Sequence, residues 1–239
     1  MLDVYARRAR LAPAALAAAP PLVLAGGALT AIEDQGSAIA FVLAALAIVL
    51  CGLVRGLGRR LEPALWESWG GAPTTQLLRW RGRSDRTTLA RRHALLAELI
   101  GEPLPTAEEE KGDPDGADER YMMATTALRE RTRSPEKFPL VATENAEYGF
   151  RRNCLGLRPF SIGIAIFTFL ISTTLIFAVS ASGLFIVPAV VSCVALLGVL
   201  TVVRPPWVRS AADLYAVRLM EALESLTVGT ADQLSGPPR

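Results

Sequence analysis

Charged residues are missing from four long stretches of this 239-residue chain, which run over residues 11–32, 37–54, 160–179 and 183–203. Each stretch is about as long as the roughly 20 residues of apolar helix that cross a bilayer core. A buried helix of a soluble domain would be shorter and would carry a polar stripe at helical spacing. The missing charges therefore predict a polytopic membrane protein with four transmembrane helices.

The first apolar stretch differs from the other three because it is rich in alanine and contains three prolines. Three arginines within residues 1–10 precede it, as in the basic segment of a signal peptide. The apolar core of a signal peptide has only about 7 to 15 residues, however, and a second apolar stretch follows here almost at once. We favour a retained span over a re-entrant segment or a cleaved signal.

Basic residues are also absent from the two short turns between paired apolar stretches. Residues 33–36 are acidic at their start, and residues 180–182 are small and neutral, whereas all 25 basic residues lie before residue 11, between 55 and 158, or after 203. Short loops rich in arginine and lysine stay in the cytoplasm. The pattern predicts two hairpins in the inner (plasma) membrane, with both termini cytoplasmic. Abundant alanine and arginine with only two lysines is typical of a bacterial source.

The predicted fold is all-α, with two transmembrane hairpins that flank a small helical cytosolic insert. The expected parts are the first hairpin (1–55), the insert (56–158), the second hairpin (159–204), and a cytosolic amphipathic helix with a tail (205–239). Within the insert, residues 101–119 are rich in Pro, Gly and Glu and predict a disordered linker. Caps and apolar spacing predict helices over 84–100, 117–133, 144–153 and 210–226.

Histidine and cysteine are too scarce to support most catalytic or metal sites. The chain has one histidine, His93, and three cysteines, none at metal-ligand spacing. No phosphate-binding loop or dinucleotide fingerprint is present, and the four spans lack the ionisable groups typical of ion-coupled carriers. We expect no cofactor, no metal and no catalytic residue. The net charge of +2 averages over separate compartments and indicates no nucleic-acid partner.

The most unusual soluble stretch is residues 65–80, LWESWGGAPTTQLLRW, called here the Trp–Gly segment. Glycine amides and a stacked indole can form a pocket for a ligand or partner. Alternatively, the tryptophans lie at the headgroup level of the membrane, where indoles are favoured. The candidate binding residues are Trp66, Trp69, Gly70, Gly71, Pro73, Thr74, Thr75 and Arg79.

Arginines next to the ends of the spans form a second candidate site. Each can gain about 1 kcal/mol from anionic lipid near the membrane surface. Anchoring on anionic lipid head groups is the favoured interpretation, and a site for an anionic ligand is the alternative. The candidate residues are Arg59, Arg60, Arg151, Arg152 and Arg158.

Three functions fit these features, in this order of preference. The first is a non-enzymatic membrane-anchored sensor, effector or scaffold that binds a partner through the cytosolic insert. The second is an oligomeric pore lined by Ser and Thr of the third and fourth spans, whose hydroxyls otherwise bond helix to helix. The third is an enzyme with an interfacial site near residues 66–79. The expected partners are the lipid bilayer and either another protein or further copies of the chain.

Overall fold

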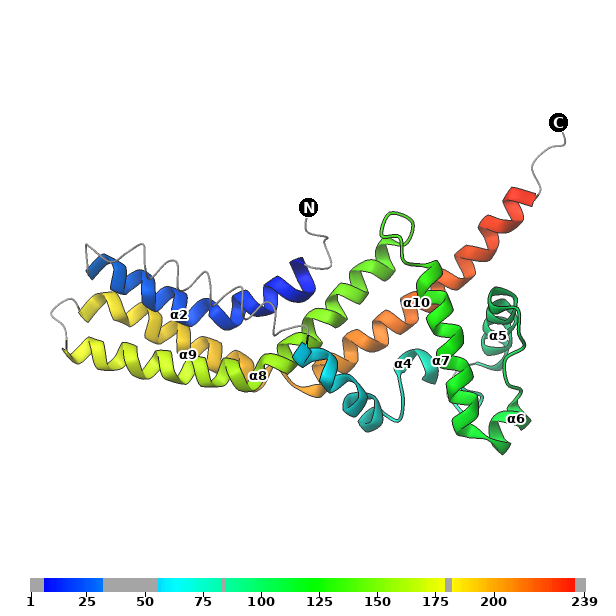
Figure 1. Ribbon diagram of the computed structural model, residues 1–239, viewed down its shortest axis with the longest axis horizontal. Coiled ribbons are helices and arrows are strands. Elements are labelled where there is room, and N and C mark those ends of the chain that lie inside the picture. The colour runs from blue at the N-terminus through cyan, green and yellow to red at the C-terminus, as the bar shows by residue number, and fades with distance from the viewer. Residues whose placement is uncertain (1–6, 32–55, 83–84, 179–181, 235–239) are drawn as a thin grey trace. The chain divides into compact units, whose positions relative to one another are not determined.

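A computed structural model describes residues 7–31, 56–82, 85–178 and 182–234 (Figure 1). These residues form helices joined by short turns, and none of them lies in a β-strand. The all-α prediction is therefore confirmed. The predicted second span, residues 37–54, and the turn before it lie outside the described residues.

Three helical stretches are long and apolar enough to cross a membrane. They cover Arg7–Ala28, Pro139–Ala178 and Gly183–Thr201. The outward side chains on the latter two are large and apolar, with exposed fractions of 66% for Phe167, 86% for Phe177 and 64% for Val194. Side chains of this kind are stable in contact with lipid tails. The three stretches indicate a membrane protein.

The chain divides into two compact units. Unit 1 contains residues 1–62 and 146–209, and unit 2 contains residues 63–145 and 210–239. A helix over residues 56–69, helix α8 (Pro139–Ala178) and helix α10 (Pro205–Leu234) each contribute residues to both units. The chain therefore passes between the units within helices.

Unit 1 is a bundle of apolar helices. It begins with a π-helical turn, η1 (Arg7–Leu11), and α2 (Ala12–Ala31), and it also contains η2 (Ser182–Phe185) and α9 (Ile186–Thr201). Helices α2 and α9 lie side by side (Figure 1). Small side chains line the buried faces, where Ala14, Ala17 and Ala18 pack with Leu157 of α8. Small residues allow helix backbones to approach closely, which favours association in a membrane.

Unit 2 has a core of larger side chains. Its helices are α4 (Pro73–Gln76), α5 (Arg86–Ile100), α6 (Ala107–Gly112) and α7 (Pro114–Arg131), joined by the first turns of α8 and most of α10. Tyr121 of α7 lies in the core and is fully buried. The same core contains buried residues from other segments of unit 2, among them Leu78, Leu96, Val141, Leu219 and Met220.

The predicted helix 84–100 is confirmed as α5. Asp85 caps it, because its side chain accepts from the Thr88 N–H at 2.9 Å. Gly101 ends it with φ of 76°, the left-handed conformation favoured by glycine. The helix predicted over 117–133 is also present, and it begins earlier, at Pro114. Those predicted over 144–153 and 210–226 are parts of the longer α8 and α10.

The prediction of a disordered linker over residues 101–119 is wrong for its second half, which forms α6 and the start of α7. Thr106 and Glu109 form a capping box, and Asp113 accepts from the Gly116 N–H to cap α7. Four of the eight acidic residues that suggested disorder lie in the first turns, where the helix dipole favours them, namely Glu108, Glu109, Glu110 and Asp115. One of them, Glu110, is buried with partners distant in sequence.

Candidate functional site

The Trp–Gly segment forms a helix end, a tight turn and a short second helix. Helix 56–69 ends with Gly70 and Gly71, which have φ of 77° and 119°. Their amides donate to the carbonyls of Glu67 and Trp66, at 3.0 and 2.7 Å. Pro73 then occupies the first turn of α4, where its missing N–H costs nothing. Both glycines have positive φ, a conformation that residues with a Cβ atom rarely adopt.

Two side chains lock this turn from within. Gln76 donates through Nε2 to the carbonyls of Trp69 and Gly71, at 2.9 and 2.7 Å. Arg79 donates through Nη1 to the carbonyl of Gly70 at 2.6 Å. A Cβ atom on Gly71 would overlap the Arg79 guanidinium, so any other residue there would displace Arg79. The carbonyl groups of the two-glycine turn thus accept hydrogen bonds from Gln76 and Arg79 of the same segment.

Arg79 carries a charge that is paired inside unit 2. Its Nε donates to Asp118 Oδ1 at 2.9 Å, and its Nη2 donates to Asp118 Oδ2, which makes a two-point contact with α7. Arg81 reaches the same carboxylate at 2.9 Å. Bidentate arginine–carboxylate contacts fix geometry as well as charge. Asp118 therefore ties the Trp–Gly segment to α7.

Glu110 is the most buried carboxylate of this network. It accepts from the backbone N–H groups of Trp80 and Arg81, at 2.8 and 3.0 Å, and from the Tyr121 hydroxyl at 2.8 Å. The Arg81 guanidinium lies 2.9 Å from its Oε1 atom. Burial acts to raise the pKa of Glu110, but these four donors hold it below its usual value. Glu110 is thus ionised at neutral pH.

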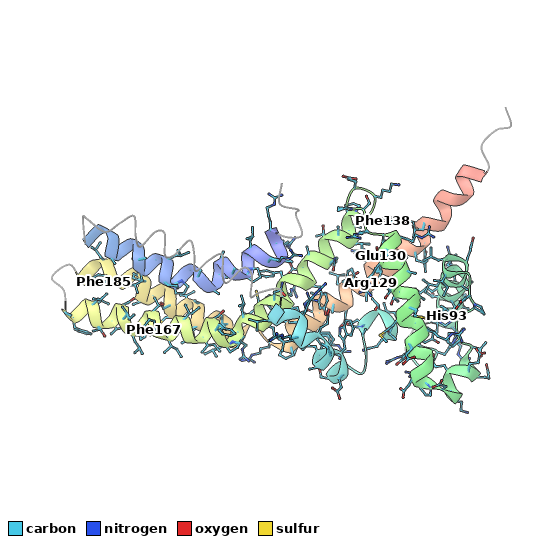
Figure 2. The ribbon with its side chains drawn as sticks, viewed as in Figure 1. His93, Arg129, Glu130, Phe138, Phe167 and Phe185 are labelled. Atoms are coloured by element: carbon cyan, nitrogen blue, oxygen red, sulfur yellow. The ribbon has the colours of Figure 1, made fainter. Side chains whose placement is uncertain are left out.

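Three aromatic rings, those of Trp80, His93 and Tyr121, contact one another next to this network. The His93 ring lies 4.9 Å from that of Trp80 and 5.3 Å from that of Tyr121. Figure 2 labels His93 on α5, where it is buried with Nε2 2.7 Å from the Leu78 carbonyl. Burial lowers the pKa of His93, despite the opposing effects of that carbonyl and the charge of Glu110. A neutral His93 therefore donates from Nε2 to Leu78 at physiological pH.

The candidate binding residues of the Trp–Gly segment lie on one continuous turn, but they differ in accessibility. Gly70 is exposed, and five others are half-buried, namely Trp66, Trp69, Gly71, Thr74 and Arg79. Pro73 and Thr75 are buried. Trp66 Nε1 and Thr75 Oγ1 are buried and make no hydrogen bond with the described residues. Binding by this segment stays a prediction, and Gly70 is the one exposed residue among these eight.

The candidate arginines of unit 1 fall into two groups. Arg151 donates to Glu147 Oε1 at 2.8 Å, the i to i+4 ion pair expected from their spacing, and to the Trp207 carbonyl at 3.1 Å. Arg152 donates to Glu62 Oε1 at 2.7 Å, and Tyr148 donates to the same oxygen at 2.8 Å. Arg59 and Arg60, by contrast, are exposed.

The hydroxyls of the apolar helices bond within single helices. Ser172 donates to the Thr168 carbonyl at 2.8 Å, and Ser192 donates to the Pro188 carbonyl at 2.7 Å. Thr173, Thr174 and Thr201 bond in the same way to the carbonyl four residues earlier. Pore lining by these hydroxyls stays a prediction.

Sequence reasoning missed the residues that organise unit 2, which are Glu110, Asp118, Arg81 and Tyr121. Glu110 and Asp118 fell within the linker predicted over residues 101–119, and the sequence did not single out Arg81 or Tyr121. One local signal was available, because Thr106 and Glu109 have the spacing of a capping box, which predicts a helix start inside the acidic stretch. Among the residues that the structure describes, no group of three or more His, Cys, Asp or Glu side chains could hold a metal ion.

Comparisons with known proteins do not narrow the function, since no protein-family model, curated protein or solved structure matches the chain.

Proposed function

We propose that the protein is a non-enzymatic, membrane-anchored sensor, effector or scaffold that binds a protein partner through unit 2. In this proposal the apolar helices form two transmembrane hairpins in the inner (plasma) membrane, with four spans and both termini in the cytoplasm. Unit 2 is then the cytosolic part, and the accessible face of the Trp–Gly segment is its binding surface.

One observation carries the proposal, namely the internal pairing of the charged side chains beside the Trp–Gly segment. Arg79, Arg81, Glu110 and Asp118 neutralise one another and bond to backbone groups. Charged groups that are paired in this way make the local structure rigid, and they are less available for proton transfer. A rigid surface with a half-buried indole, Trp69, suits recognition, because aromatic side chains dominate the binding energy of protein interfaces.

The continuity of the helices supports a role in signalling as well as anchoring. Helix 56–69, α8 and α10 each supply residues to both units. If unit 2 has two arrangements, a partner that binds one of them more tightly shifts the protein toward that arrangement. The helices shared with unit 1 would then shift as well. Shared helices provide a covalent and hydrogen-bonded route for such coupling.

Site-specific photo-crosslinking in cells tests the binding surface. A photoreactive amino acid at Thr74, next to the glycine turn, should give a discrete crosslinked protein, whereas one at Lys111, exposed on α6, should not. Trp69→Ala in the Thr74 background should abolish the product without lowering the amount of protein in the membrane. Equal crosslinking from both positions, or an unchanged product in the Trp69→Ala variant, would contradict the proposal.

A further inference from the structure

The polar end of unit 1 carries a large excess of positive charge. The described residues of this unit contain ten arginines and no lysine, against two acidic residues, Glu62 and Glu147. The excess of eight positive charges is hidden in the whole-chain value of +2. Close like charges repel one another, so anions that bind near these arginines would stabilise unit 1.

Three contacts bring the arginine-bearing segments to one stretch of α8, residues 151–158. Asn153 donates through Nδ2 to the Ala9 carbonyl, which places Arg8 and Arg10 of η1 beside this stretch. The Arg151 guanidinium bonds to the Trp207 carbonyl of α10, near Arg204 and Arg209.

The third contact concerns the helix that carries Arg59 and Arg60. A Cβ atom on Gly156 would lie 2.8 Å from the Gly58 nitrogen, so the two helices touch backbone to backbone at this point. Arg59, Arg60 and Arg158 are one or two residues from this crossing. At 1.5 Å per residue, their Cα atoms lie within about 3 Å of the crossing along each helix.

This crossing also marks where the charged surface of unit 1 ends. Arg158 is the last charged residue of α8, and the 20 residues from Pro159 to Ala178 contain none. Phe160, two residues further on, is 48% exposed. A change from arginine to exposed phenylalanine within one helical turn is typical of the boundary between headgroups and lipid tails.

Some of the arginines at this boundary are neutralised within the protein. Arg8 and Arg151 share Glu147, each at 2.8 Å, and Arg152 pairs with Glu62. Arg59 and Arg60 are exposed and make no ion pair with any residue that the structure describes. Arg158 Nε is buried and has no hydrogen-bond partner in the same part of the chain.

We propose that Arg59, Arg60 and Arg158 bind the phosphate groups of anionic phospholipids, while Arg151 and Arg152 hold the helices together. A guanidinium binds a phosphate through two parallel N–H groups and is more weakly hydrated than an ammonium group, which suits an interface. All the basic residues described in unit 1 are arginines, and none is a lysine. This inference does not depend on partner binding by unit 2.

Native mass spectrometry of the full-length protein tests the proposal, with phosphatidylglycerol or phosphatidylcholine added to the detergent-solubilised protein. The wild-type protein should retain phosphatidylglycerol in preference to phosphatidylcholine. An arginine near an anionic surface contributes about five-fold in affinity, so Arg59→Gln combined with Arg60→Gln should weaken phosphatidylglycerol binding roughly thirty-fold. Arg86→Gln combined with Arg131→Gln, a matched exposed pair in unit 2, should leave it unchanged.

The remaining outcomes separate this assignment from its alternatives. Equal retention of the two lipids, or full retention by the Arg59/Arg60 double variant, overturns the proposal. Displacement of phosphatidylglycerol by millimolar glycerol 3-phosphate overturns it in favour of a soluble anion. Arg152→Gln should lower the thermal stability of the protein, since it leaves Glu62 without its guanidinium. If Arg152→Gln instead removes lipid binding and leaves the stability unchanged, Arg152 belongs with the lipid-binding arginines, and the proposed assignment is wrong.

Discussion

Gly58 and Gly156 meet where helix 56–69 crosses α8, so closely that a Cβ atom on Gly156 would lie 2.8 Å from the Gly58 nitrogen. A Cβ atom on Gly58 would overlap the side-chain oxygen of Asn153, which is itself buried between the helices. The crossing depends on two residues without side chains, one on each helix. The crossing fixes the positions of Arg59 and Arg60 along helix 56–69 relative to that of Arg158 on α8.

The first prediction concerns this crossing. Gly156→Ala should destabilise unit 1 by about 1–3 kcal/mol, because the added methyl group would lie against the backbone of helix 56–69 and force the two helices apart. Gly163→Ala, at an open position on the same α8, should be neutral or slightly stabilising, since alanine is the better helix former. Thermal unfolding of both variants in detergent gives the comparison. Equal midpoints for the two variants would refute the close approach.

The second prediction concerns the buried carboxylate of unit 2. Glu110→Ala should destabilise unit 2 by about 3–5 kcal/mol, because it leaves Arg81 and two backbone N–H groups without their shared acceptor. Glu108→Ala, exposed on the same helix, is the matched control and should change stability by less than about 0.5 kcal/mol. Urea unfolding followed by tryptophan fluorescence measures both, because Trp80 lies beside Glu110. A small effect of Glu110→Ala would mean that the carboxylate is solvated.

The third prediction is a fall in stability at mildly acidic pH. The folded state lowers the pKa of His93, so the unfolded chain takes up a proton first as the pH drops below about 6.5. Stability should therefore decrease from there until the folded pKa of His93 is reached, by at most about 1.4 kcal/mol per pH unit. Glu110, whose pKa is also lowered, adds a second loss that starts near the ordinary glutamate value of about 4.5.

His93 is the only histidine of the chain, so its contribution can be isolated. In His93→Gln the amide can still donate to the Leu78 carbonyl, but no group titrates in the ring's place. Urea midpoints measured between about pH 7.5 and about pH 5.5 should fall for the wild type and stay level for the variant. Parallel pH profiles for the two proteins would show that His93 is not the group responsible.

The fourth prediction compares the two glycines of the Trp–Gly segment. Both have positive φ, so Gly70→Ala should cost about 1 kcal/mol in backbone strain alone, because open space surrounds that position. Gly71→Ala should cost more, since its methyl group would also displace the Arg79 guanidinium from Gly70 and Asp118. The difference in urea midpoint between the two variants measures the steric part. An equal loss would indicate that Arg79 moves aside freely.

The fifth prediction tests the proposed topology. In a protein whose three native cysteines are replaced by serine, Gln35→Cys and Ala181→Cys should react with a membrane-impermeant maleimide added to intact cells. Lys111→Cys should react only after the cells are permeabilised. The reason is the complete absence of basic residues from both short turns. Labelling of position 111 in intact cells would reverse the assigned orientation.

Local patterns made the helices of this chain predictable where the deciding interactions are also local. Helix α5 was found from its apolar spacing and from Gly101, although the sequence placed its cap at Ser84 and the cap is Asp85. The membrane stretches were found from their length and missing charges. The acidic stretch was misjudged because its composition matches that of solvated linkers. Its buried Glu110 is bound by partners that are 29 and 30 residues earlier in the chain, which a local pattern does not reveal.

The candidate sites show the same division. The sequence singled out the two-glycine turn and the juxtamembrane arginines from residue type and spacing. It did not indicate that Arg79 covers the turn, or that Arg151 and Arg152 are paired while Arg59 and Arg60 are exposed. These differences depend on which carboxylates lie nearby in space, and Glu62 is 90 residues from Arg152.

The sequence by itself therefore determined the helical class and the membrane character, because both follow from the transfer of uncharged stretches out of water and from backbone hydrogen bonding along the chain. Only the tertiary structure decided which charges are neutralised inside the protein and which remain for a ligand or lipid. Ion pairing depends on distances of a few ångströms between groups that can lie anywhere in the chain. Such distances are set by helix crossings like that of Gly58 and Gly156.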